Sequence, residues 1–168
     1  MSEKSPKDED FEAAKRASVA QLLMKCGRLL NERGVQHFGE EMGVDTLRAA
    51  HTNLFPHIDM EGTRLTDLAQ RVGISKQAVG QLVDELEEMG AVERVPDPAD
   101  GRAKLIRFAS EGGQPVLMRG MAVLGQLEAQ IQDEIGARQM KQLHRALLAI
   151  EAWLSARPTD EEASRSAR

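Results

Sequence analysis

One short stretch, SKQAVGQL, combines side chains that can hydrogen-bond to a nucleic-acid duplex. Ser75 and Lys76 can donate to phosphate oxygens, and Gln77 and Gln81 carry the donor and acceptor pair that fits the edge of adenine. Gly80 has no side chain, so the backbone beside it can come close to another molecule. We expect the stretch to begin a helix, with Ser75 as its N-cap, and to offer these five residues to a DNA partner.

A second candidate contact is the turn-forming stretch PDPADG, which has Arg94 before it and Arg102 and Lys104 after it. Two prolines, two aspartates and a glycine favour a turn, and the flanking segments AVERV and AKLIRF alternate apolar and polar residues. The pattern predicts a β-hairpin with a long polar tip. An extended arginine at such a tip fits the narrow minor groove of DNA, where the negative potential is deepest.

Apolar periodicity indicates how these two contacts are positioned. Residues at i, i+3, i+4 and i+7 are apolar between 79 and 86, which predicts a helix over 75–89 with one buried face. A shorter helix is predicted over 66–72, and Gly73 separates the two. A helix, a turn, a longer helix and a hairpin make up a winged helix-turn-helix, in which the second helix enters the major groove.

The remaining predicted helices cover 11–38, 45–54, 113–135 and 137–156. The last carries an apolar stripe at nearly heptad spacing, made of Met140, Leu143, Leu147, Ile150 and Leu154. The first carries a stripe longer than a small domain covers. The predicted fold class is therefore mainly α with a small β-hairpin wing, a winged helix-turn-helix joined to a helical dimerisation region.

The stretch RLTDLAQRVGISKQAVGQLVDELEEMGAVERVPDPADGRAKLIRF resembles the DNA-binding core of the MarR family of bacterial transcriptional regulators. The likeness runs from about 47 to 111 and includes the family's D-x-R wing motif, here Asp100-Gly101-Arg102. It implies that Lys76, Gln77 and Gln81 face the major groove and Arg102 the minor groove, with Asp100 bracing Arg102. It also implies a homodimer that reads a pseudo-palindromic operator in double-stranded DNA.

Five segments follow from this likeness and from the composition. We expect flexible tails at 1–10 and 158–168, a winged helix-turn-helix DNA-binding domain at 45–111, and a dimerisation region formed by 11–44 and 112–157. The expected function is sequence-specific transcriptional regulation, as a repressor that a small-molecule effector releases from DNA.

The resemblance also implies a small aromatic or anionic effector, bound between the dimerisation helices and the DNA-binding lobe. Met24 and Arg28 on the first helix, and Arg48 and His51 on the second, are the residues predicted to line that site. Each of them is equally an ordinary packing or surface residue.

Two alternatives to this function are open. Cys26 can act as a peroxide-sensing thiol, or the winged helix can bind a protein. Cys26 stands on the apolar stripe of its helix, and the chain contains no tyrosine to assist such a thiol, so a core position is favoured. Lysine, glutamine and arginine at the three expected DNA contacts favour nucleic acid over a protein partner.

Several other classes are disfavoured by the sequence. The four histidines are scattered without metal-ligand spacing, so neither a metal, a cofactor nor an enzyme is expected; His57, with Asp59 and Glu61 after it, is the nearest approach to a catalytic cluster. No apolar run approaches the roughly 18–20 residues of a membrane span. The charged N-terminus does not resemble a signal peptide, which predicts a cytoplasmic protein. A net charge of −5 counts against DNA binding unless the bases are locally concentrated.

Overall fold

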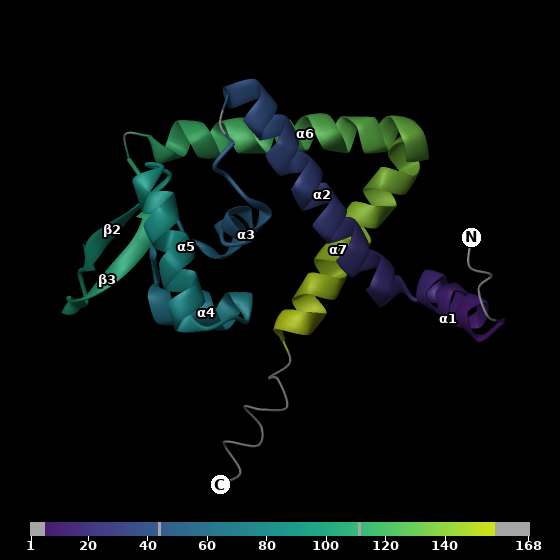
Figure 1. Cartoon of the computed structure of the whole chain (residues 1–168), viewed down its shortest axis with the longest axis horizontal. Helices are drawn as coiled ribbons and strands as arrows, with labels where there is room; N and C mark the ends of the chain where they lie inside the picture. Colours follow the sequence, from purple (N-terminus) through teal and green to yellow (C-terminus); the bar gives the residue numbers. More distant parts are fainter. Residues whose placement is uncertain (1–5, 44, 111, 157–168) are drawn as a thin grey trace, which may run out of the picture. The chain divides into compact units, whose positions relative to one another are not determined.

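The computed structural model describes residues 6–43, 45–110 and 112–156 (Figure 1). The chain divides into two compact units, of which the first ends at Leu124 and the second begins at Gly125. The predicted mainly α fold with a small β wing is confirmed. None of the helices in the described part of the chain is long and apolar enough to cross a bilayer.

The predicted first helix is two helices, α1 (Pro6–Ala17) and α2 (Val19–Met42). Ser18 interrupts them because its backbone is extended and its Oγ accepts a hydrogen bond from the Gln21 N–H at 3.3 Å, which makes it the N-cap of α2. The single helix over 11–38 was therefore a wrong prediction. Of the tails expected at 1–10 and 158–168, residues 6–10 belong to α1, and 1–5 and 158–168 lie outside the described residues.

The winged helix-turn-helix follows in the predicted order. Its elements are α3 (Ala49–Thr52), the 3-10 helix η1 (Phe55–His57), β1 (Thr63–Arg64), α4 (Leu65–Val72), α5 (Lys76–Glu88), β2 (Val92–Asp97) and β3 (Asp100–Phe108). The sheet is antiparallel in the order β1-β3-β2, and its short strand β1 was not predicted. Gly73 ends α4 with a φ of 76°, a left-handed conformation that favours glycine and makes the sharp turn into α5.

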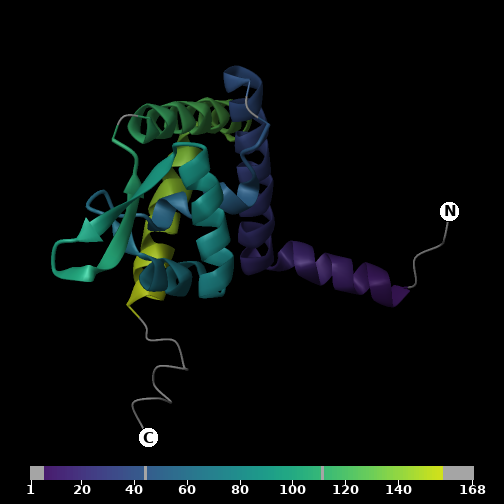
Figure 2. The same ribbon diagram turned by 60° about the vertical axis from the view of Figure 1, so that its left-hand side comes forward.

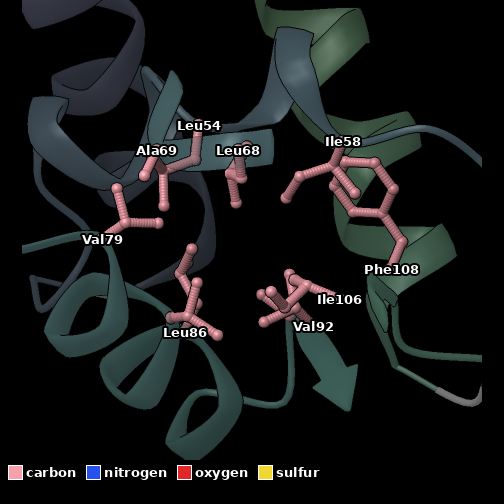
Figure 3. Close-up of a cluster of buried hydrophobic side chains, with 11 residues drawn as sticks. Leu54, Ile58, Leu68, Ala69, Val79, Leu86, Val92, Ile106 and Phe108 are labelled. Atoms are coloured by element: carbon pink, nitrogen blue, oxygen red, sulfur yellow. The ribbon is translucent and has the colours of Figure 1, made fainter. Parts of the chain in front are cut away.

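The predicted apolar face of α5 is buried at the centre of this domain (Figure 3). Val79, Val83 and Leu86 are fully buried, and Leu82 is partly buried. They belong to a cluster of buried side chains that come also from α4, from strands β2 and β3, and from the segments that precede α4 and β2. These side chains are Leu54, Ile58, Leu68, Ala69, Ala91, Val92, Ile106 and Phe108. At about 1.5–3 kcal/mol for each large apolar side chain, this burial fixes the rotation of α5 about its axis.

Helices α6 (Gly113–Ile135) and α7 (Ala137–Ser155) match the predicted ranges to within one residue. At Gly113 a Cβ would stand 2.4 Å from the Ala91 carbonyl oxygen, so only glycine allows the chain to leave the sheet here. No residue of α7 is buried within the described chain, and Leu147, Trp153 and Leu154 are 41–60% exposed.

The wing is shorter at its tip than predicted, because only Pro98 and Ala99 separate β2 from β3. Asp97 holds this turn. Its carboxylate is buried and accepts hydrogen bonds from the Ala99 N–H at 2.8 Å and from Arg64 Nε at 2.7 Å. These donors, the Ala99 amide first and the Arg64 side chain second, lower the pKa of Asp97. The carboxylate thereby ties the wing to the start of α4.

Replacing Asp97 with asparagine tests this tie through its pH dependence. A lowered folded-state pKa means that the charged carboxylate stabilises the fold above the unfolded-state pKa and loses that effect as the pH falls through the folded-state pKa. We therefore expect Asp97→Asn to melt below the wild type at pH 7, and the gap in Tm to narrow as the pH is lowered toward 3. Thermal melts across that range measure it, with Glu88→Gln on the exposed side of α5 as the control. A gap that is constant with pH contradicts the assignment.

Candidate nucleic-acid interface

The N-terminal end of α5 is built as the sequence predicts. Ser75 has an extended backbone, and its Oγ accepts the Ala78 N–H at 3.2 Å, which confirms it as the N-cap. Lys76, Gln77 and Gln81 are exposed. A Cβ at Gly80 would meet only Leu65 Cδ2, at 4.0 Å, so packing inside the chain does not require glycine at this position.

The wing presents the second group of predicted contacts. Arg102 and Lys104 are exposed on β3, and the β2–β3 tip extends away from α4 and α5 (Figures 1 and 2). Pro96 pairs with Lys104 and Asp97 with Asp100, so residues 101–103 have no partner on β2. Asp100 accepts a hydrogen bond from the Arg102 backbone N–H at 3.1 Å, so its bracing acts on the main chain and leaves the guanidinium free to extend.

Arg94, the third predicted basic contact of the wing region, is engaged inside the domain. Its guanidinium pairs with Asp84 at 2.5 Å and with Glu87, both on α5, and its side chain is 22% exposed. Burial disfavours the charge, but the two carboxylates outweigh this and raise the pKa of Arg94. This geometry makes Arg94 a residue that fastens β2 to α5.

The basic residues of the domain divide into those that pair with carboxylates, as Arg94 does, and those that have no ion pair. Lys and Arg occur eight times between 45 and 110. Five of these side chains pair with carboxylates, namely Arg48, Arg64, Arg71, Arg94 and Arg107. Within the described residues, Lys76, Arg102 and Lys104 have no ion pair. The unneutralised positive charge of this domain therefore lies at the start of α5 and on the wing.

Two of the predicted effector residues instead connect α3 to α5. His51 is fully buried, and its Nδ1 accepts the Arg48 backbone N–H at 3.1 Å. The ring proton then belongs on Nε2, which donates to Glu85 Oε2 at 2.7 Å. The Arg48 guanidinium pairs with the same carboxylate. Hydrogen bonds from Arg48, the larger effect, and from His51 lower the pKa of Glu85.

The other two predicted effector residues lie on the outside of α2. Met24 is 62% exposed, and Arg28 forms an exposed pair with Glu32 at 2.5 Å. A cavity of about 790 Å³ does lie between α2, the segment from Leu47 to Met60, and α6 up to Leu124. None of the four predicted effector residues lines it. The cavity was not predictable from α2 alone because its wall is assembled from separate segments, namely these three together with Val72 of α4 and Phe108 of β3.

Cys26 is exposed in this chain, so the prediction of a core position was wrong. The stripe that contains it belongs to a helix whose first half is mostly uncovered by the rest of the described chain. Asp59, which follows His57 in the sequence, is used inside the domain. Its carboxylate pairs with Arg71 at 2.8 Å and accepts a hydrogen bond from the Thr63 hydroxyl at 3.1 Å. The described residues contain no group of three or more His, Cys, Asp or Glu side chains that could hold a metal ion.

Comparison with known proteins relates this geometry to a family. A family model described as "MarR family" matches residues 50–103. The chain is similar to wild-type MarR from E. coli, with a TM-score of 0.60, 18% identity, and coverage of 79% of this chain and 96% of that one. It is similar to a MarR-family transcriptional regulator from Rhodococcus sp. RHA1, with a TM-score of 0.61, 24% identity, and coverage of 88% and 96%.

A third similar structure was solved with a small molecule. It is CouR from Rhodococcus jostii RHA1 bound to p-coumaroyl-CoA, with a TM-score of 0.60, 26% identity, and coverage of 81% of this chain and 93% of that one. The matched residues 50–103 hold α3, α4, α5 and β2, with the D-x-R motif at their end. Residues 50–103 of the chain therefore match the MarR family, and the chain shares the winged-helix fold of the solved MarR-family structures.

Proposed function

We propose that this chain is a sequence-specific DNA-binding regulator, a homodimeric repressor that acts on a pseudo-palindromic operator in the bacterial cytoplasm and is released by a small molecule. One observation carries the DNA-binding part. Among the described residues of the winged helix-turn-helix, 45–110, the three basic side chains without an ion pair stand on the two elements that a winged helix places against DNA. Within that domain, the concentration of unneutralised positive charge at these positions supports a phosphate-bearing partner.

The proposal gives each residue a task at the duplex. Gln77 and Gln81 read base edges in the major groove, Lys76 and Ser75 contact phosphates, and Gly80 allows close approach of the backbone. Packing within the chain does not require glycine at position 80, which supports a close approach by a partner molecule as the reason for it.

On the wing, Arg102 enters the minor groove and Lys104 contacts the backbone phosphates. Arg94 is left out of this contact set, because its charge is satisfied by Asp84 and Glu87. Its task is to hold the wing in place relative to α5.

Exposed apolar surface on two helices supports the dimer. On α2, Val19, Leu22 and Leu29 are 43–66% exposed, and on α7 Leu143 and Leu147 are 41–42% exposed. Contiguous apolar faces of this kind on a single chain are typical of an interaction surface. Cys26, four residues after Leu22 and three before Leu29, shares their face of α2, so a second copy would cover it.

The cavity between α2, the 47–60 segment and α6 is the proposed effector site. Its volume lies within the range of about 300–1,000 Å³ that is usual for small-molecule sites. The p-coumaroyl-CoA bound to CouR shows that a protein with a similar fold holds an organic ligand. The part of the 47–60 segment that forms α3 also carries His51, whose hydrogen bond reaches the recognition helix α5.

The operator itself can be recovered by selecting bound duplexes from a randomised pool with the purified full-length protein. We expect an inverted repeat with half-sites about one helical turn, roughly 10 base pairs, apart. Recovery of no common sequence would count against sequence-specific binding.

Arg102→Ala and Gln77→Ala separate the tasks of wing and helix. Loss of Arg102 removes a charge, so binding should weaken broadly and the slope of log affinity against log salt should fall by roughly 1 per monomer. Loss of Gln77 should cost about 1–3 kcal/mol at its preferred base with little change in salt slope. Affinities for the operator and for a scrambled duplex at several salt concentrations measure both effects.

Both residues are exposed and off the buried face of α5, so wild-type melting temperatures are the control for folding. Wild-type affinity of Arg102→Ala for both duplexes would remove the wing from the DNA contact. The protein-binding alternative would then gain support.

Two aspartates in place of Leu147 and Ile150 test the dimer. Two charges on the apolar face of α7 should abolish association of the two copies and lower the stability of the protein, because this face can no longer pack against a partner. Aspartates at Ala149 and Ala152, on the opposite side of α7, are the matched control and should leave the dimer intact. Light scattering at micromolar concentration distinguishes the species, and a folded wild-type monomer would contradict the proposal.

A further inference from the structure

The cavity has a wall almost without charge. Its 22 lining residues, all in the described part of the chain, include no aspartate, glutamate, lysine or arginine. Eighteen of them are aliphatic or aromatic residues, methionine, proline or glycine. The four polar ones are Asn31, Thr52, Asn53 and His57.

Much of the hydrogen-bonding capacity of these polar side chains is already used within the wall. Asn31 Nδ2 donates to Asn53 Oδ1 at 2.6 Å and to the Ala49 carbonyl at 3.0 Å. The Thr52 hydroxyl donates to Asn31 Oδ1 at 2.5 Å. Within the described residues, the amide nitrogen of Asn53 and the imidazole of His57 are left to serve an occupant.

Three arginines near the cavity pair with carboxylates elsewhere, and the two cations of α2 without an ion pair among the described residues, Lys25 and Arg33, are exposed and do not line it. Arg28 pairs with Glu32, Arg48 with Glu85, and Arg71 with Asp59, and none of the three lines the cavity. A carboxylate or phosphate that entered the cavity would lose its hydration without gaining a cation. Such a transfer is strongly unfavourable.

We propose that this cavity takes a neutral, largely apolar molecule of aromatic size that carries one or two hydrogen-bonding groups, and that it discriminates against anions. The sequence had implied an aromatic or an anionic effector, and the wall supports only the aromatic one. The inference rests on the proposed function for its consequence, release of DNA, whereas the binding preference itself follows from the wall.

The dye N-phenyl-1-naphthylamine, a neutral aromatic probe that fluoresces in apolar surroundings, tests the site in the full-length protein. We expect saturable binding that Gly120→Leu and Gly27→Leu each weaken at least about tenfold. A Cβ at either glycine meets no atom within 4 Å, and replacing a helical glycine favours the helix, so both variants should fold. Gly125→Leu, on α6 outside this cavity and equally unobstructed, is the matched control and should bind the dye like the wild type.

Competition between methyl p-coumarate and p-coumarate tests the charge. The first is a neutral methyl ester, and the second carries a charged carboxylate in the same place. We expect the ester to displace the dye at a concentration at least about tenfold lower than the carboxylate needs. Equal or stronger displacement by the anion would overturn the inference. So would absence of dye binding to the wild type, as when side chains of a second copy fill the cavity, or dye binding that both leucine variants retain.

Operator binding in the absence of any small molecule distinguishes the two proposals. A protein that binds the operator and prefers the anion contradicts the inference alone. A protein that prefers the neutral ester and does not bind duplex DNA contradicts the proposed function alone.

Discussion

Burial of one face of α5 is the constraint on which the rest of the domain depends. Val79, Val83 and Leu86 are fully buried, and at about 1.5–3 kcal/mol each they outweigh the exposed ion pairs around them, which contribute about 0–1 kcal/mol apiece. With 100° between successive residues, Gln77 and Gln81 then lie about half a turn from Val79. The core therefore sets the direction of the polar face, and the ion pairs refine a position that packing has already chosen.

The distribution of charge reconciles an acidic chain with the proposed DNA partner. The chain carries a net charge of −5, and α5 itself contains four acids, Asp84, Glu85, Glu87 and Glu88. The first three pair with an arginine from outside α5, either Arg48 or Arg94. The same pairs that neutralise these three acids also hold the start of α3 and β2 against α5. The basic side chains of residues 45–110 that remain without an ion pair lie at the start of α5 and on the wing, which is the local concentration of bases that DNA binding by a chain of such net charge requires.

Local rules predicted what local interactions determine. The Ser75 cap, the glycine turn at Gly73, the buried stripe of α5 and the two long C-terminal helices all follow from residues within one or two turns of each other. The break at Ser18 had a local signal, a serine that can cap the next turn, but the continuous apolar periodicity concealed it.

The errors at the site have a different cause, because they concern partners far apart in the sequence. Nothing near Arg94 indicates that Asp84 will be its partner, and nothing near His51 indicates Glu85, 34 residues away. A charged residue is therefore easily taken for a ligand contact when the fold has already paired it. The cavity shows the same limit, since α2, the 47–60 segment and α6 form its wall only after the chain has folded.

The position of α3 connects the cavity to α5 through very few atoms. On one side Asn31 of α2 binds the Ala49 carbonyl and Asn53, and on the other His51 binds Glu85 of α5. A helix of four residues has little internal hydrogen bonding to resist displacement, so its position depends on these two sets of contacts. Under the proposed function, an occupant that disturbs the Asn31 contacts acts on the same short helix that orients His51. Because His51 is fully buried, a shift of α3 cannot be absorbed by rotating its ring into solvent, and it must change either the Glu85 hydrogen bond or the position of α5.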